Sequence, residues 1–139
     1  MTTDLSLVDR FLRGELDPMA FGHLDHLRVG YQLLQAHDFS TAAHLFSRAL
    51  KAMAAHAGRP DAYHQTITLA FLALIGERAA SRTFADFDDF VGANPDLLDK
   101  AVLRRWYAPE RLHSETARRV FLLPEAAGAS RGGPAPDRP

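Results

Sequence analysis

The sequence predicts an all-α fold, an antiparallel helical bundle of about five to six helices in a single helical domain over residues 1–125. Apolar residues recur at the three-and-four spacing of one helix face in most segments. No segment shows sustained alternation of apolar and polar residues, so no sheet is expected. Capping residues, glycines and prolines mark the expected helix ends and leave only short loops between the helices, and short loops favour antiparallel neighbours.

The first two helices are predicted from apolar spacing and from their end signals. Residues 4–13 carry leucine, valine and phenylalanine at helical intervals, and Gly14 follows as a plausible stop. Residues 21–36 are expected to form the second helix, which has an apolar seam with a polar stripe beside it. The aspartate–proline pair between these segments indicates a turn, or a cap with proline in the first helical turn.

The third and fourth helices have the clearest end signals in the chain. Ser40 is a good N-cap for the third helix, and Gly58 stands where a C′ glycine belongs. Asp61 can cap the fourth helix, which is predicted over residues 62–79. Because this segment is apolar nearly all round, we expect it to be the central, buried helix of the bundle.

The C-terminal part is predicted to contain three shorter elements. Residues 81–91 hold phenylalanines on one face, and Asn94-Pro95 is a cap-plus-proline signature for another helix. A last short helix is expected over residues 114–121. Residues 126–139 are glycine, proline, alanine and arginine with few apolar groups, which is typical of a disordered tail.

Composition limits the classes of function. The chain has 139 residues, a formal net charge of −1 and no cysteine. This charge gives no argument for nucleic-acid or anionic-membrane binding, and the missing thiols exclude disulfides, thiolate zinc sites and a cysteine nucleophile. Residues 1–13 lack the basic start and apolar run of a signal peptide, and residues 67–75 are too short an apolar run to span a bilayer. We therefore expect a cytoplasmic protein.

Three of the seven histidines are predicted to converge. His23 and His26 are three residues apart, so they share a helix face. If the second, third and fourth helices fold back on one another as hairpins, residues equally far from each joint lie at the same level of the bundle. His64 then reaches the level of the histidine pair, and we expect these three side chains to share one metal ion.

Such a site would suit several metals and more than one chemistry. Three neutral imidazoles with an open fourth position are typical of catalytic zinc, and the ligands also suit iron, nickel or copper. A bound water could be activated there, as in a small metalloenzyme acting on a small-molecule substrate. Hydroxyls at Tyr63, Thr66 and Thr68 could hold that water or orient the ligands. His56 falls at the same end, as a further pocket residue or a solvated helix-end histidine.

Other interpretations of these histidines stay open. A histidine pair at this spacing often marks only a polar helix edge, and a single histidine can serve a small-ligand pocket as a hydrogen-bond donor. His37-Asp38 is reminiscent of His-Asp phosphohydrolases, but the preceding histidine is too close in sequence for that architecture. Carboxylate-bridged di-iron bundles need a Glu-x-x-His motif on each of two helices, and the chain has only one such spacing, from Glu110 to His113. No nucleophile-elbow pattern supports a Ser-His-Asp triad.

A non-enzymatic class also fits the sequence. Residues 23–56 resemble one tetratricopeptide unit, with Gly30, Ala42, Phe46 and Ala49 at that motif's spacing. The pattern does not recur 34 residues later, so a solenoid is not expected. The alternative function is therefore a helical protein-interaction module built on one tetratricopeptide-like hairpin.

The chain carries three spaced patterns, which are Phe21-x-His23-x-x-His26-Leu27, then Gly58 with Tyr63-His64-x-Thr66-x-Thr68, then Ser114-x-x-Ala117-Arg118 with Phe121-x-x-Pro124. These patterns are similar to those of a family of small bacterial helical proteins with no established activity. The resemblance runs from about residue 20 to residue 125 and implies a shared site without naming a reaction. Relatives tend to have glutamate at the position of Gln65, which puts any role of that carboxylate in doubt here.

The last of these patterns could add a cation to the predicted pocket. Arg118 could pair with an anionic substrate at the pocket mouth, or it could be a solvated residue of a helix capped by Ser114. Trp106 and Tyr107 could line the pocket, although a core position is the simpler expectation for the tryptophan.

Overall fold

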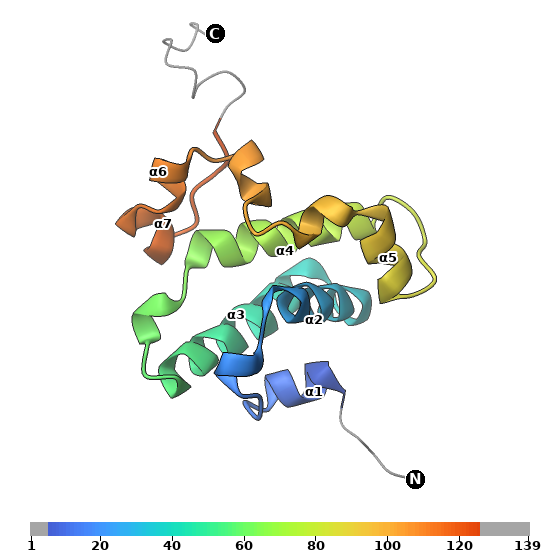
Figure 1. Cartoon of the computed structure of the whole chain (residues 1–139), viewed down its shortest axis with the longest axis horizontal. Helices are drawn as coiled ribbons and strands as arrows, with labels where there is room; N and C mark the ends of the chain where they lie inside the picture. Colours follow the sequence, from blue (N-terminus) through green and yellow to red (C-terminus); the bar gives the residue numbers. More distant parts are fainter. Residues whose placement is uncertain (1–5, 126–139) are drawn as a thin grey trace, which may run out of the picture.

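The computed structural model describes residues 6–125, and within them 69% of residues are helical and no strand is found. The predicted all-α class is confirmed (Figure 1). The tail predicted over residues 126–139 lies outside the described residues. The α-helices are α1 (Leu7–Leu12), α2 (His23–Ala36), α3 (Phe39–His56), α4 (Gln65–Ala79), α5 (Phe87–Ala93), α6 (Pro109–Leu112) and α7 (Glu115–Arg119). Four short 3-10 helices connect them, η1 (Pro18–Ala20), η2 (Pro60–Ala62), η3 (Pro95–Leu98) and η4 (Val102–Arg105).

Helix α4 lies at the centre of the bundle, as its nearly uniform apolar sequence predicts. In Figure 1 it crosses the middle of the view, with α2 and α3 on one side and the elements from η3 to α7 on the other. It packs against α2, α3 and α7. The predicted central helix is therefore confirmed in position, although its start is not.

Two hydrophobic clusters lie on opposite faces of α2. Leu27 and Tyr31 belong to a cluster shared with α4, α5 and the C-terminal elements. Val29 and Leu33 belong to a second cluster shared with α1 and α3. Gly30 lies between these faces, where a Cβ would come within 3.0 Å of Ile75 Cδ1. The small residue of the tetratricopeptide-like pattern therefore mainly serves the contact of α2 with α4, and only secondarily the predicted α2–α3 hairpin.

Several predicted helix ends are found as expected. Gly14 and Gly58 follow α1 and α3 with φ of 73° and 77°, a conformation that glycine adopts without the steric cost of a Cβ. The Ser114 hydroxyl accepts from the Ala117 N–H and caps α7. The cap of α3 differs from the prediction, because Asp38 accepts from Thr41 and the helix begins before Ser40.

Three predicted elements were wrong in their extent. The element predicted over residues 81–91 begins only at Phe87, as α5, where Asp86 caps it. Helix α4 begins at Gln65 rather than at residue 62, because the extended backbone of Tyr63 (ψ 138°) separates it from η2. Its cap is consequently His64 and not Asp61. The helix predicted after Asn94-Pro95 is replaced by η3 and η4, because Asp99 has an extended ψ of 119° that breaks it. Within residues 6–125, no helix is both long and apolar enough to cross a membrane.

Candidate functional site

The histidine pair of α2 lies at the start of that helix, and each ring has its own aromatic neighbour. The Nε2–H of His23 donates to the Leu97 carbonyl at 2.9 Å, and its ring centroid is 5.1 Å from that of Phe71. The Nδ1–H of His26 donates to the Gly22 carbonyl at 2.9 Å, and its ring is 4.6 Å from that of Phe21. Burial lowers the pKa of His26, with the His23 ring adding to the effect. The two imidazoles are therefore near one another but are engaged with different partners.

His64 has a third and separate set of partners. Its Nδ1 accepts from the Ile67 N–H at 3.1 Å, which makes it the N-cap of α4. Its Nε2 therefore carries the proton and donates to the Leu112 carbonyl at 2.7 Å. Burial lowers its pKa, and the nearby Arg118 guanidinium lowers it further. Both ring nitrogens of this neutral imidazole are thus used to join α4 to the C-terminal elements.

The hydrogen bonds of His23, His26 and His64 do not decide whether these side chains bind the predicted metal ion. In residues 6–125 no group of three histidine, aspartate or glutamate side chains is arranged to hold a metal. His64 would have to release Ile67 or Leu112 before it could become a ligand. The site of His23, His26 and His64 therefore stays a prediction, for which the Discussion gives a direct measurement.

The Tyr63-His64-x-Thr66-x-Thr68 stretch has a clear structural role at the start of α4. Thr66 is fully buried, and its hydroxyl donates to the Val120 carbonyl at 2.7 Å. The same oxygen accepts from the Leu122 N–H at 3.0 Å. Together with the bond from His64 to Leu112, these contacts fasten the segment after α7 to α4. We call His64 and Thr66 with these three backbone partners the α4 junction.

Four further residues were predicted as part of the histidine pocket, namely Tyr63, Thr68, His56 and Arg118. Arg118 donates to the Asp61 carbonyl at 2.8 Å, so it ties α7 to η2 and is not directed at an open cavity. The Tyr63 hydroxyl donates to Gln65 Oε1 at 2.7 Å, which gives the amide at this position a role that a glutamate could also fill. Thr68 is buried, whereas His56 is exposed as the last residue of α3.

The α4 junction also fixes one wall of a groove that lies along α4. Beyond Leu122 the chain is held a second time, because the buried Tyr107 hydroxyl donates to the Leu122 carbonyl at 2.8 Å. The Glu125 N–H then donates to the Trp106 carbonyl at 3.0 Å, and the Glu125 carboxylate accepts from the Ala108 N–H at 3.1 Å. The segment from Phe121 to Glu125 is therefore held from two sides, and the groove it borders is preformed.

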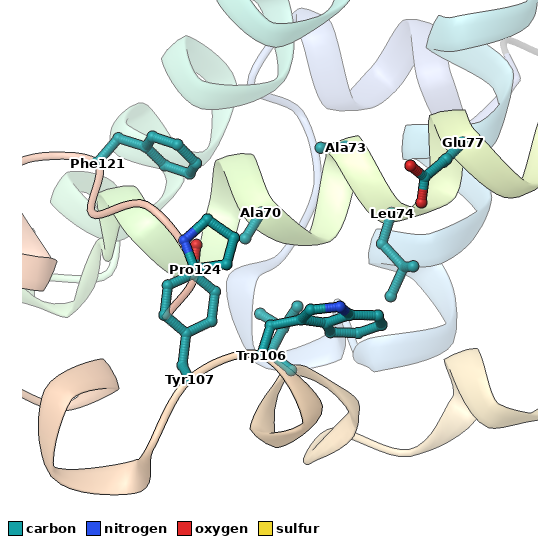
Figure 2. A pocket seen from close by; sticks show the side chains of 9 residues that line it. Ala70, Ala73, Leu74, Glu77, Trp106, Tyr107, Phe121 and Pro124 are labelled. Carbon is teal, nitrogen blue, oxygen red and sulfur yellow. The ribbon is translucent and has the colours of Figure 1, made fainter. Parts of the chain in front are cut away.

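The groove has a floor of small residues and walls of aromatic ones (Figure 2). Its floor is one face of α4, with Ala70, Ala73, Leu74 and Glu77 at the spacing i, i+3, i+4 and i+7. Its walls are Leu103, Trp106, Tyr107, Phe121 and Pro124. Figure 2 shows Phe121 and Pro124 toward one end of the floor and Glu77 toward the other. The cavity volume is about 210 Å³.

Sequence reasoning identified only part of this groove. Trp106 and Tyr107 were considered as lining residues of the histidine pocket, with a core position preferred for the tryptophan, whereas in the structure both line this other groove. Glu77 was not among the residues predicted for a site. The signal that could have found the groove is the alanine-rich face of an otherwise large-residue helix, ending in a single carboxylate.

The fold and groove describe an all-α protein with a preformed apolar surface depression. Comparison with protein-family models, with curated proteins and with solved structures finds no match to this chain. The family resemblance suggested by the sequence patterns accordingly stays a prediction.

Proposed function

We propose that this protein is a non-enzymatic helical interaction module that binds a segment of another protein in the groove between α4 and the Trp106–Pro124 wall. The observation that carries the proposal is the groove itself, which is preformed by backbone hydrogen bonds on both sides of its C-terminal wall. A preformed site avoids part of the ordering cost of binding.

The size of the groove favours a protein segment over a free small molecule. Pockets for drug-sized ligands usually span about 300–1,000 Å³. The cavity here, at about 210 Å³, is smaller and suits one side chain. A protein partner can insert one such anchor and gain the rest of its binding energy from the surrounding surface.

That surrounding surface is apolar. Phe121 lines the groove, and Val120 and Leu123 lie close to it in the sequence; these three residues are 40%, 48% and 70% exposed, respectively. Exposed apolar side chains are common singly, but a run of them beside a pocket is typical of an interaction surface. This run supports a peptide segment as the occupant, since it extends the contact beyond the cavity.

The proposal is tested by selecting peptide ligands with the intact protein. Random twelve-residue peptides displayed on phage are selected on the wild type and then measured on two variants. Ala73→Leu fills the groove floor at an exposed helix position, and Ala52→Leu makes the same change on the exposed face of α3. We expect peptides whose binding falls more than about tenfold in Ala73→Leu and is unchanged in Ala52→Leu, because a well-packed anchor contributes at least about 1.4 kcal/mol.

Two results would overturn the proposal. One is a selection that yields no binding peptide at all. The other is a set of peptides that bind Ala73→Leu as well as they bind the wild type. Far-ultraviolet circular dichroism of both variants checks that each retains its helical content.

A further inference from the structure

We infer that the anchor accepted by the groove is a lysine or arginine side chain, whose aliphatic stem lies along α4 and Trp106 and whose cation lies at Glu77. This inference rests on the proposed function and adds the chemistry of the occupant. It combines three features of the groove, which are its small-residue floor, its indole wall and its one carboxylate.

The floor has the right length for such a side chain. Ala73 and Glu77 are one helical turn apart, about 6 Å along the axis of α4. Lysine carries its ammonium on a flexible four-carbon stem, and arginine has a comparable reach. A stem that enters over Ala73 therefore brings its charge to the carboxylate of Glu77, while its methylene groups cover the alanine floor.

Glu77 forms no direct ion pair within the described part of the chain. Its neighbour Arg78 is directed away to η3, where it donates to both oxygens of Asp96 and to Asn94. The groove therefore presents an exposed carboxylate at the end of an apolar floor.

The indole of Trp106 offers a second attraction for a cation. Elsewhere in residues 6–125, cationic groups lie over aromatic rings, with Arg28 over Phe87, Lys51 over Tyr63 and Arg82 over Phe84. No such pair involves Trp106 in this part of the chain, and tryptophan is the ring that attracts cations most strongly. An incoming lysine or arginine can use this face.

A purely apolar anchor fits the groove less well. It would cover the floor equally, but it would also remove water from the Glu77 carboxylate without replacing it by a positive charge, which is unfavourable. An exposed ion pair together with a cation–π contact gives a cationic anchor a preference of about 5- to 30-fold over a neutral one.

Trp106 is the only tryptophan in the chain, so its fluorescence reports on the groove directly. The probes are the Nα-acetyl amides of lysine, arginine, norleucine and glutamate, titrated at constant ionic strength up to the order of tens of millimolar. Dissociation constants are taken from Trp106 emission and from the NMR shift of its indole N–H. We expect the lysine and arginine probes to bind about 5- to 30-fold more tightly than norleucine, and glutamate to bind least.

Two variants separate the roles of charge and shape. Glu77→Gln keeps the size of the side chain and should lower the preference for lysine over norleucine to about 2- to 5-fold, which is what the cation–π contact with Trp106 alone would give, without weakening norleucine binding. Glu110→Gln, at an exposed position of α6 outside the groove, is the matched control and should keep the full preference. An undiminished preference in Glu77→Gln would overturn the inference.

The possible failures are distinguishable from that of the proposed function. Equal affinity for lysine and norleucine in the wild type would make the anchor apolar, which overturns the inference and leaves the interaction groove intact. If no probe changes the Trp106 signals, the inference fails, and the peptide selection with Ala73→Leu decides the proposed function separately.

Discussion

Replacing Thr66 by valine should show how much of the stability depends on the α4 junction. The two side chains have nearly the same shape, so the change removes the hydroxyl and little else. The loss leaves the Val120 carbonyl and the Leu122 N–H without their partner, at 2.7 and 3.0 Å respectively. Each unpaired buried group costs about 1–3 kcal/mol, and we use the lower half of that range because the Val120 side chain is 48% exposed. For two such groups, the expected loss in the free energy of unfolding is about 2–4 kcal/mol.

Urea denaturation followed by circular dichroism measures this loss, and Trp106 fluorescence shows whether the groove wall is released first. Thr66→Ser is the control, because it keeps the hydroxyl and removes one methyl group, for about 1 kcal/mol. The valine variant should therefore be the less stable of the two. If Thr66→Ser loses as much stability as Thr66→Val, packing of the methyl group rather than hydrogen bonding holds the junction, and the reasoning is refuted.

Three further predictions concern pH, a helix end and metal. Burial holds the pKa of His64 and of His26 below 6.5, so the native state binds fewer protons than the unfolded chain. The free energy of unfolding should therefore fall as the pH drops below about 6.5. Urea titrations at about pH 7.5 and about pH 5.5 measure this fall, and His64→Gln should make the fall smaller. Gly58→Ala should lower the free energy of unfolding by about 1–2 kcal/mol in the same assay, because the φ of Gly58 is 77°. An unchanged urea midpoint would contradict this, since the end of α3 would then adopt another backbone conformation at no cost. The predicted three-histidine site requires near-stoichiometric metal in protein purified without tag or chelator, and this metal should be lost in His26→Ala and in His64→Ala. Protein that contains no metal and is not stabilised by added zinc, iron(II), nickel or copper would contradict the site.

The fold class could be predicted because helical periodicity and end signals are local. Gly14, Gly58 and Ser114 act through their own backbone conformation or through residues three positions away, so the sequence alone reveals them. The apolar character of α4 likewise predicted its central position. The phenylalanines of residues 81–91 were predicted to share one face, and Phe87 and Phe90 are buried in the core.

The parts that sequence reasoning missed depend on contacts between distant residues. His64 bonds to Leu112, which is 48 residues away, and Thr66 to Val120, which is 54 residues away. No local pattern distinguishes a histidine that caps a helix from one that binds a metal, because both roles use a nitrogen lone pair of a neutral imidazole. The extended residue Asp99 likewise interrupts a segment whose apolar spacing alone favours a continuous helix.

The position of α2 and α4 between two hydrophobic clusters affects how the protein unfolds. Both helices contribute side chains to each cluster, with Leu27 and Val29 on α2 and Phe71 and Leu72 on α4. Neither cluster can dissolve without exposing a face of these two helices, so amide hydrogen exchange should be slowest in α2 and α4 and faster in α1 and α7. The protein is then one cooperative unit with a shared centre, in which the groove-bearing helix is among the last elements to open.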